Sequence, residues 1–73
     1  MRLTWVRCEI SEGAWYLDDL DIERTGPMSQ HTGFVIIRSK AGYEVHYMQH
    51  LATLETLEDA QRYAVVAYQL GGH

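Results

Sequence analysis

The segment 57–70 is the only part of the chain with the spacing of an amphipathic helix, and this restricts the fold more than any other feature. Thr56 can cap such a helix, Asp59 three residues later approximates a capping box, and Gly71-Gly72 can end it. Apolar and small residues recur at helical spacing at Leu57, Ala60, Ala64, Ala67 and Tyr68. The sequence therefore predicts a C-terminal helix over about 57–70, whose small alanines allow it to lie close to a sheet.

The rest of the chain has the alternating pattern of β-strands, and we predict strands over about 3–10, 14–22, 34–38 and 43–49. In the first strand, Val6, Cys8 and Ile10 would share one face. The run 34–38 is apolar except for Arg38 at its end, which is typical of a strand buried on both faces or at the core of a sheet. The segment 23–33 holds the only proline and would form the one long loop.

Aspartate is a poor strand residue, so the second strand is the least regular. We expect it to bend or bulge near Asp18-Asp19, and a strand that ends at Leu17 and continues as a loop is the alternative. Tight turns are expected at Ser11-Glu12-Gly13 and at 39–42. In 43–49, Tyr43, Val45 and Tyr47 would share a face.

Strands that precede a single helix predict a two-layer α+β fold. We expect a small antiparallel sheet of three to four strands, packed by one C-terminal α-helix, in a single domain over 1–73. One helix covers only one face of such a sheet. The second face would then be free to meet a partner or water.

The charge and cysteine content argue against several classes of protein. The net charge is −4 and the isoelectric point about 5.4, whereas nucleic-acid binders and proteins attracted to anionic membranes need basic surfaces. Cys8 is the only cysteine, so no internal disulfide can form and a reducing, cytoplasmic compartment is expected. No run approaches 18 apolar residues, and the N-terminal segment lacks the apolar core of a signal peptide.

Six of the ten acidic residues lie within fifteen positions, at Glu9, Glu12, Asp18, Asp19, Asp21 and Glu23. Such a strip could dock on the basic surface of a larger protein by electrostatic steering. A solvated edge strand that resists aggregation is the alternative, and a cation site is a weaker one because no EF-hand spacing is present. The partner-binding residues that we predict are Asp18, Asp19, Asp21 and Glu23, with Trp15 and Tyr16 as apolar anchors.

No catalytic motif is present, and we expect a protein that is not an enzyme and holds no metal or cofactor. Cys8 could act as a nucleophile, but its place in a predicted strand favours a small buried hydrophobic residue. His46 and His50 are four apart, a zinc-site spacing on a helix. In an extended strand, the same two positions lie roughly 13 Å apart.

The stretch GYEVHY at 42–47, followed by LETLEDA at 54–60, resembles a phrase in short phage and mobile-element proteins, in which a hairpin strand leads into a helix. It is similar to that in the arm-type DNA-binding domains of phage integrases, although the sheet region is acidic here and basic there. Small acidic phage accessory proteins include anti-CRISPR and anti-restriction inhibitors. The resemblance implies that class and transfers no functional residue.

These observations favour a small acidic protein-binding module, in its sharpest form a phage-type inhibitor that docks on the nucleic-acid-binding surface of a host defence nuclease. The alternative is a nucleic-acid-binding accessory domain of the integrase-arm type. It would gather basic side chains on one sheet face, namely Arg2, Arg7, Arg24, Arg38 and Lys40. An edge strand or the uncovered sheet face could also pair two copies as a homodimer.

Overall fold

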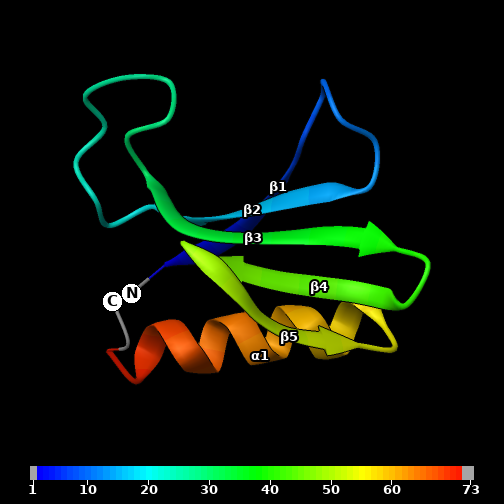
Figure 1. Ribbon diagram of the computed structural model, residues 1–73. Coiled ribbons are helices and arrows are strands. Elements are labelled where there is room, and N and C mark those ends of the chain that lie inside the picture. The colour runs from blue at the N-terminus through cyan, green and yellow to red at the C-terminus, as the bar shows by residue number, and fades with distance from the viewer. Residues whose placement is uncertain (1, 72–73) are drawn as a thin grey trace.

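The computed structural model describes residues 2–71 and consists of five strands followed by one helix (Figure 1). The elements are β1 (Leu3–Arg7), β2 (Ala14–Asp19), β3 (His31–Ser39), β4 (Gly42–Tyr47), β5 (Gln49–Leu54) and α1 (Leu57–Gln69). Each strand pairs antiparallel with the next, in the order β1-β2-β3-β4-β5. The antiparallel sheet with one C-terminal helix packed on it confirms the predicted α+β fold, with five strands where three to four were expected.

The additional strand is β5, and it exists because the chain reverses at Met48. Met48 has a positive φ of 65° and is 95% exposed between β4 and β5. Tight hairpin turns usually contain Gly or Asn, because these residues adopt a positive φ at little cost. This turn contains neither. The prediction of one strand over 43–49 was therefore wrong at its end.

The ends of the first two strands also differ from the prediction. β1 ends at Arg7, so Cys8 lies beyond it, and Ile10 is 99% exposed in the β1–β2 turn. The predicted face of Val6, Cys8 and Ile10 was wrong, because Leu3 and Trp5 pack against the core in its place. β2 stops at Asp19 and not at 22, while its register shift between Tyr16 and Asp18 confirms the expected irregularity.

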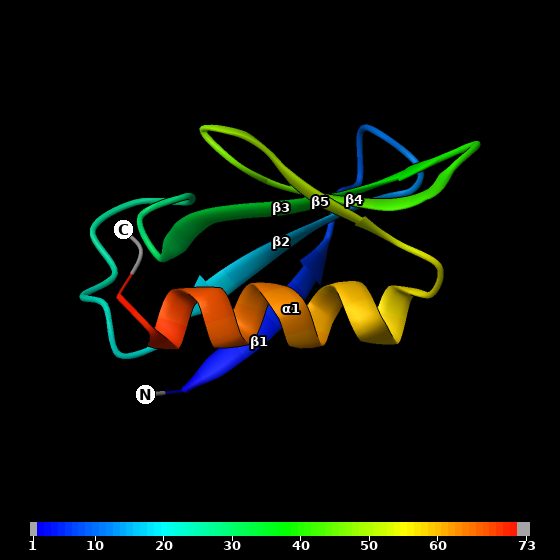
Figure 2. The same ribbon diagram turned by 60° about the horizontal axis from the view of Figure 1, so that its bottom comes forward.

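The helix covers one face of the sheet, as Figure 2 shows, and contacts β3, β4 and β5. The fully buried large side chains beneath it are Leu17, Phe34, Ile36 and Val45. Ala60 and Ala64 are also fully buried, which confirms that small residues bring the helix close to the sheet. At the helix start, the Thr56 hydroxyl accepts the backbone N–H of Asp59 at 3.1 Å, as a capping residue does.

The run 34–38 lies in the central strand, at the core of the sheet, which was the second of the two predicted alternatives. It is not buried on both faces, because the strand alternates. Phe34 and Ile36 face the helix, whereas Ile37 is 41% exposed on the other side. β3 also begins earlier than predicted, at His31, and includes Gly33. This glycine has a φ of 98°, and a Cβ there would lie 2.8 Å from the Tyr47 ring. Within residues 2–71, no helix has the length and apolar character that a membrane span requires.

Candidate binding face of the sheet

The face of the sheet opposite α1 carries a row of side chains that crosses all five strands. In register order, Val6 pairs with Tyr16, Tyr16 with Val35, Val35 with His46 and His46 with His50. No helix in the described chain covers this side. We call this surface the open face, comprising Val6, Tyr16, Asp18, His31, Val35, Ile37, Glu44, His46 and His50.

One cluster on the open face joins β2 to β3. The Tyr16 ring stacks on the His31 ring, with centroids 4.9 Å apart and planes inclined by 7°. The His31 Nδ1 atom bonds to the Asp18 carboxylate, whose side chain is only 13% exposed. The aromatic faces are thus fixed in position before any partner arrives, which lowers the entropy cost of binding.

The same tyrosine reaches the turn between β1 and β2. Its hydroxyl donates to the Cys8 Sγ atom at 3.6 Å, and the backbone N–H of Ser11 donates to the same sulfur at 3.3 Å. The Ser11 N–H, followed by the Tyr16 hydroxyl, lowers the pKa of the Cys8 thiol. Cys8 is half-buried outside the strand, so its predicted place in the core was wrong.

A second cluster joins β4 to β5. The His46 Nε2 atom lies 3.0 Å from the Glu44 Oε1 atom, and this hydrogen bond, followed by one from Ser39, lowers the pKa of Glu44. The His46 and His50 rings are 5.2 Å apart between centroids, because the reversal at Met48 makes the two residues cross-strand partners. The expected separation of about 13 Å, which assumed one extended strand, was therefore wrong.

The described residues position no third potential metal ligand to complete a site with this pair of histidines. Among residues 2–71, no three His, Cys, Asp or Glu side chains are placed so that they could hold a metal ion together. His50 instead lies 2.9 Å from the Thr53 hydroxyl. The polar groups of the open face thus form pairs with one another.

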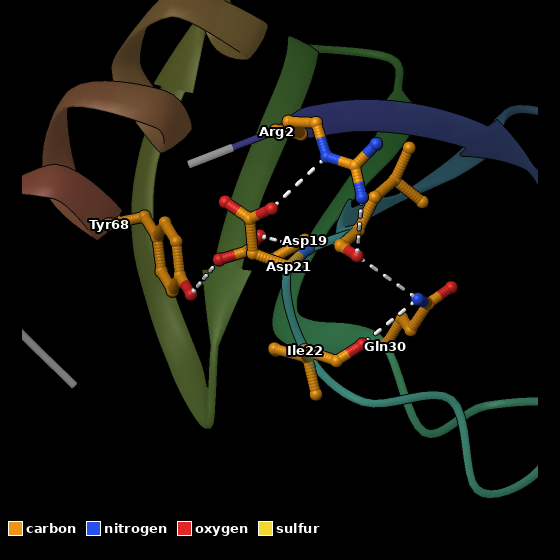
Figure 3. Close-up of polar contacts among 7 residues, drawn as sticks. Arg2, Asp19, Asp21, Ile22, Gln30 and Tyr68 are labelled. Carbon is orange, nitrogen blue, oxygen red and sulfur yellow. Dashed lines mark hydrogen bonds and ion pairs between the residues drawn. The ribbon is translucent and has the colours of Figure 1, made fainter.

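The acidic residues of the predicted strip lie in different environments, some buried and some exposed. Asp18 and Asp19 are buried, at 9% and 6% exposure, and as strand neighbours they point to opposite faces. Asp19 faces the helix, where its carboxylate accepts the Tyr68 hydroxyl at 2.8 Å and the backbone N–H of Asp21 at 2.9 Å (Figure 3). These two donors, the hydroxyl first, lower the pKa of Asp19. Asp18 and Asp19 are therefore both part of the folded framework, and of the two only Asp18 lies on the open face. Their contact with a partner stays a prediction.

Asp21 and Glu23 are the exposed members of the predicted strip. The Arg2 Nε atom donates to Asp21 at 3.1 Å, and the Gln30 amide donates to the Ile22 carbonyl at 3.0 Å (Figure 3). These bonds hold the start of the β2–β3 loop. The other exposed acids of the strip, Glu9 and Glu12, lie in the β1–β2 turn, at the opposite end of β2.

The two predicted anchors point to opposite faces because they are adjacent in a strand. Tyr16 is part of the open face. Trp15 is half-buried on the helix side and packs against Tyr43, with ring centroids 6.0 Å apart. Only Tyr16 is therefore placed on the same surface as the exposed row of rings.

The basic side chains considered for nucleic-acid binding are dispersed. Arg24 precedes β3 and Lys40 follows it, so they lie at opposite ends of the longest strand. Arg2 is engaged with Asp21, and the Arg38 side chain approaches Gly13 in the β1–β2 turn. The expected gathering of these cations on one sheet face is not observed in the described residues.

His31, Val35, Ile37 and Glu44 were not singled out from the sequence as binding residues. Val35 and Ile37 alternate with the core residues of β3, a signal hidden by the continuous apolar run. Glu44 lies on the face opposite the predicted set Tyr43, Val45 and Tyr47, and His31 lies in the segment predicted as a loop. Comparisons of the chain with family models, with curated proteins and with solved structures find no match.

Proposed function

We propose that this chain is a non-catalytic protein-binding module that docks through its open face on a basic surface of a larger protein. The observation that carries the proposal is the uncovered cross-strand row of Tyr16, Val35, His46 and His50. Rings held by stacking and hydrogen bonds, with partly exposed Val6 and Ile37 beside them, suit a protein interface, where aromatic anchors supply much of the affinity.

The charges around this surface favour a basic partner. Asp18 and Glu44 lie on the open face, and exposed acids stand in the loops at both ends of β2. The strand positions that face this side carry no lysine or arginine in the part of the chain that the structure describes. A positive partner surface would therefore approach without like-charge opposition at neutral pH.

The finer proposal is that this partner is a defence nuclease, and that docking blocks its nucleic-acid site. A protein with a phosphate-binding groove offers the basic surface that an acidic module would seek. This version rests on the acidic charge and on the resemblance of 42–47 and 54–60 to phage accessory proteins.

The test is capture of the partner from the native host with the immobilised full chain, followed by titration of the purified partner. Ile37→Lys adds positive charge to the open face and should weaken binding by about 30-fold or more, the effect of losing one hot spot. Ile10→Lys makes the same chemical change at the 99% exposed turn position and should leave binding nearly unchanged.

Two results would contradict the proposal. Equal affinity of Ile37→Lys and wild type would remove the open face from the interface. An affinity that does not fall with added salt would argue against a basic partner surface. If the partner is a nuclease, competition with its nucleic acid then separates inhibition from binding elsewhere.

A further inference from the structure

The β5 edge of the sheet and the flank of α1 beside it form a second surface, which adjoins the open face at His50 of β5. A shallow groove lies between strand and helix here, lined by Leu54, Tyr63, Val66, Ala67 and Leu70 together with Asp59 and Arg62. Leu70 is 81% exposed, Val66 48% and Tyr63 39%. We propose that this surface is a homodimer interface, in which the β5 strands of two copies pair antiparallel about a twofold axis.

The composition of β5 selects a second copy as the occupant. An exposed strand edge offers unpaired backbone groups, and proteins usually protect it with charged residues or proline. β5 (Gln49–Leu54) contains no Lys, Arg, Asp, Glu or Pro, whereas the other edge strand, β1, ends in Arg7. A twofold axis places β5 of one copy opposite β5 of the other, so a charged residue in β5 would lie near the same charge on the second copy. β5 avoids this repulsion as long as His50 is uncharged.

The two charged residues that line the groove, Asp59 and Arg62, carry opposite charges. The Arg62 guanidinium lies 2.9 Å from the Glu58 carboxylate and 3.7 Å from that of Asp59. The remainder of the flank is apolar. The groove thus lacks the unbalanced charge that would select a charged peptide as its occupant.

The position of the helix fits this pairing. α1 contacts β3, β4 and β5 to a similar extent, so its axis lies over the middle strand of the three, β4. In a β5–β5 pair, the β4 strands of the two copies are three strand spacings apart, about 14 Å. Two helices with side chains are each about 10–12 Å wide, so axes about 14 Å apart leave only about 2–4 Å between the helix surfaces, and Tyr63, Val66 and Leu70 of the two copies would face one another there.

The area that a stable homodimer needs is a modest share of the surface of this chain. A stable interface buries about 800 Å² per partner. The whole surface is 5058 Å², so about one-sixth of it would be covered. The six-residue strand β5 and the flank of the thirteen-residue helix α1 are the parts that would supply it.

The experiment is sedimentation velocity of the full chain from micromolar to millimolar concentration, with circular dichroism to confirm folding. We expect wild type to reach twice the monomer mass of 8.4 kDa. The double variant Val66→Lys/Leu70→Lys places four positive charges at the twofold interface and should raise the dimer dissociation constant by about 30-fold or more. Both positions are substantially exposed in one chain, so the fold should persist.

Ile10→Lys and Ile37→Lys are the matched controls, since they change exposed isoleucines in the β1–β2 turn and on the open face. Wild type that stays monomeric at millimolar concentration would overturn the proposal. A dimer that survives the double variant, or that is lost in Ile37→Lys, would overturn it as well, because the contact would then lie elsewhere. None of these measurements involves the partner of the open face, so the two proposals fail separately.

Discussion

The two faces of the sheet are built from alternate residues of the same strands, yet they satisfy their polar groups in different ways. On the covered face, the Asp19 carboxylate takes its donor from Tyr68 on the helix, across the core. On the open face, the hydrogen-bond partners of the Asp18 and Glu44 carboxylates are His31 and His46, which belong to the same sheet. The polar groups of the covered face therefore need the helix, whereas those of the open face are paired within the sheet itself.

The largest expected difference between the faces is in packing. Ile36 and Ile37 are adjacent in β3, fully buried on one face and 41% exposed on the other. Ile36→Ala should lower the free energy of unfolding by about 2–5 kcal/mol, because it leaves a cavity under the helix. Ile37→Ala should cost less than about 1 kcal/mol. Urea unfolding of both variants measures the difference, and equal losses would show that both faces are packed.

An intermediate effect is expected at the bond between sheet and helix. Tyr68→Phe removes the hydroxyl that Asp19 accepts and should lower the free energy of unfolding at pH 7 by about 1.5–3 kcal/mol. The folded-state pKa of Asp19 is lowered, so its contribution is present above the unfolded value near 3.9 and is lost as the pH falls through the folded one. The difference between wild type and Tyr68→Phe should thus shrink at pH 3, and a constant difference would refute the assignment.

The smallest effect is expected on the open face. His46→Ala removes the first cause of the lowered pKa of Glu44, which should then rise toward its ordinary value in an NMR titration. The unfolding midpoint should change little, because the pair is partly exposed to solvent and screened by it. A large loss of stability would mean that this face, too, is structural.

Features that depend on residues close together in the sequence were predicted correctly more often than features that depend on distant residues. The helix, its Thr56 cap and the hairpin turn at 39–42 were predictable, because each depends on residues a few positions apart. The irregularity after Tyr16 followed from the low strand preference of aspartate. The reversal at Met48 was not predictable from turn composition, since methionine seldom adopts a positive φ.

The candidate site was less accessible to sequence reasoning than the fold. The acidic run was visible, but burial of Asp19 depends on Tyr68, which is 49 positions away. The pairing of His46 with His50 required the unforeseen turn, and the stack of Tyr16 on His31 required the register of β2 against β3.

The sequence alone determined that strands precede one amphipathic helix, that two layers result and that the chain is acidic. Local propensity and periodicity are sufficient for these properties, because they act within a few residues. The tertiary structure decided which carboxylates are buried, which rings share a surface and which strand edge is left uncharged. Those outcomes depend on register and on contacts between distant segments, which single-strand patterns do not encode.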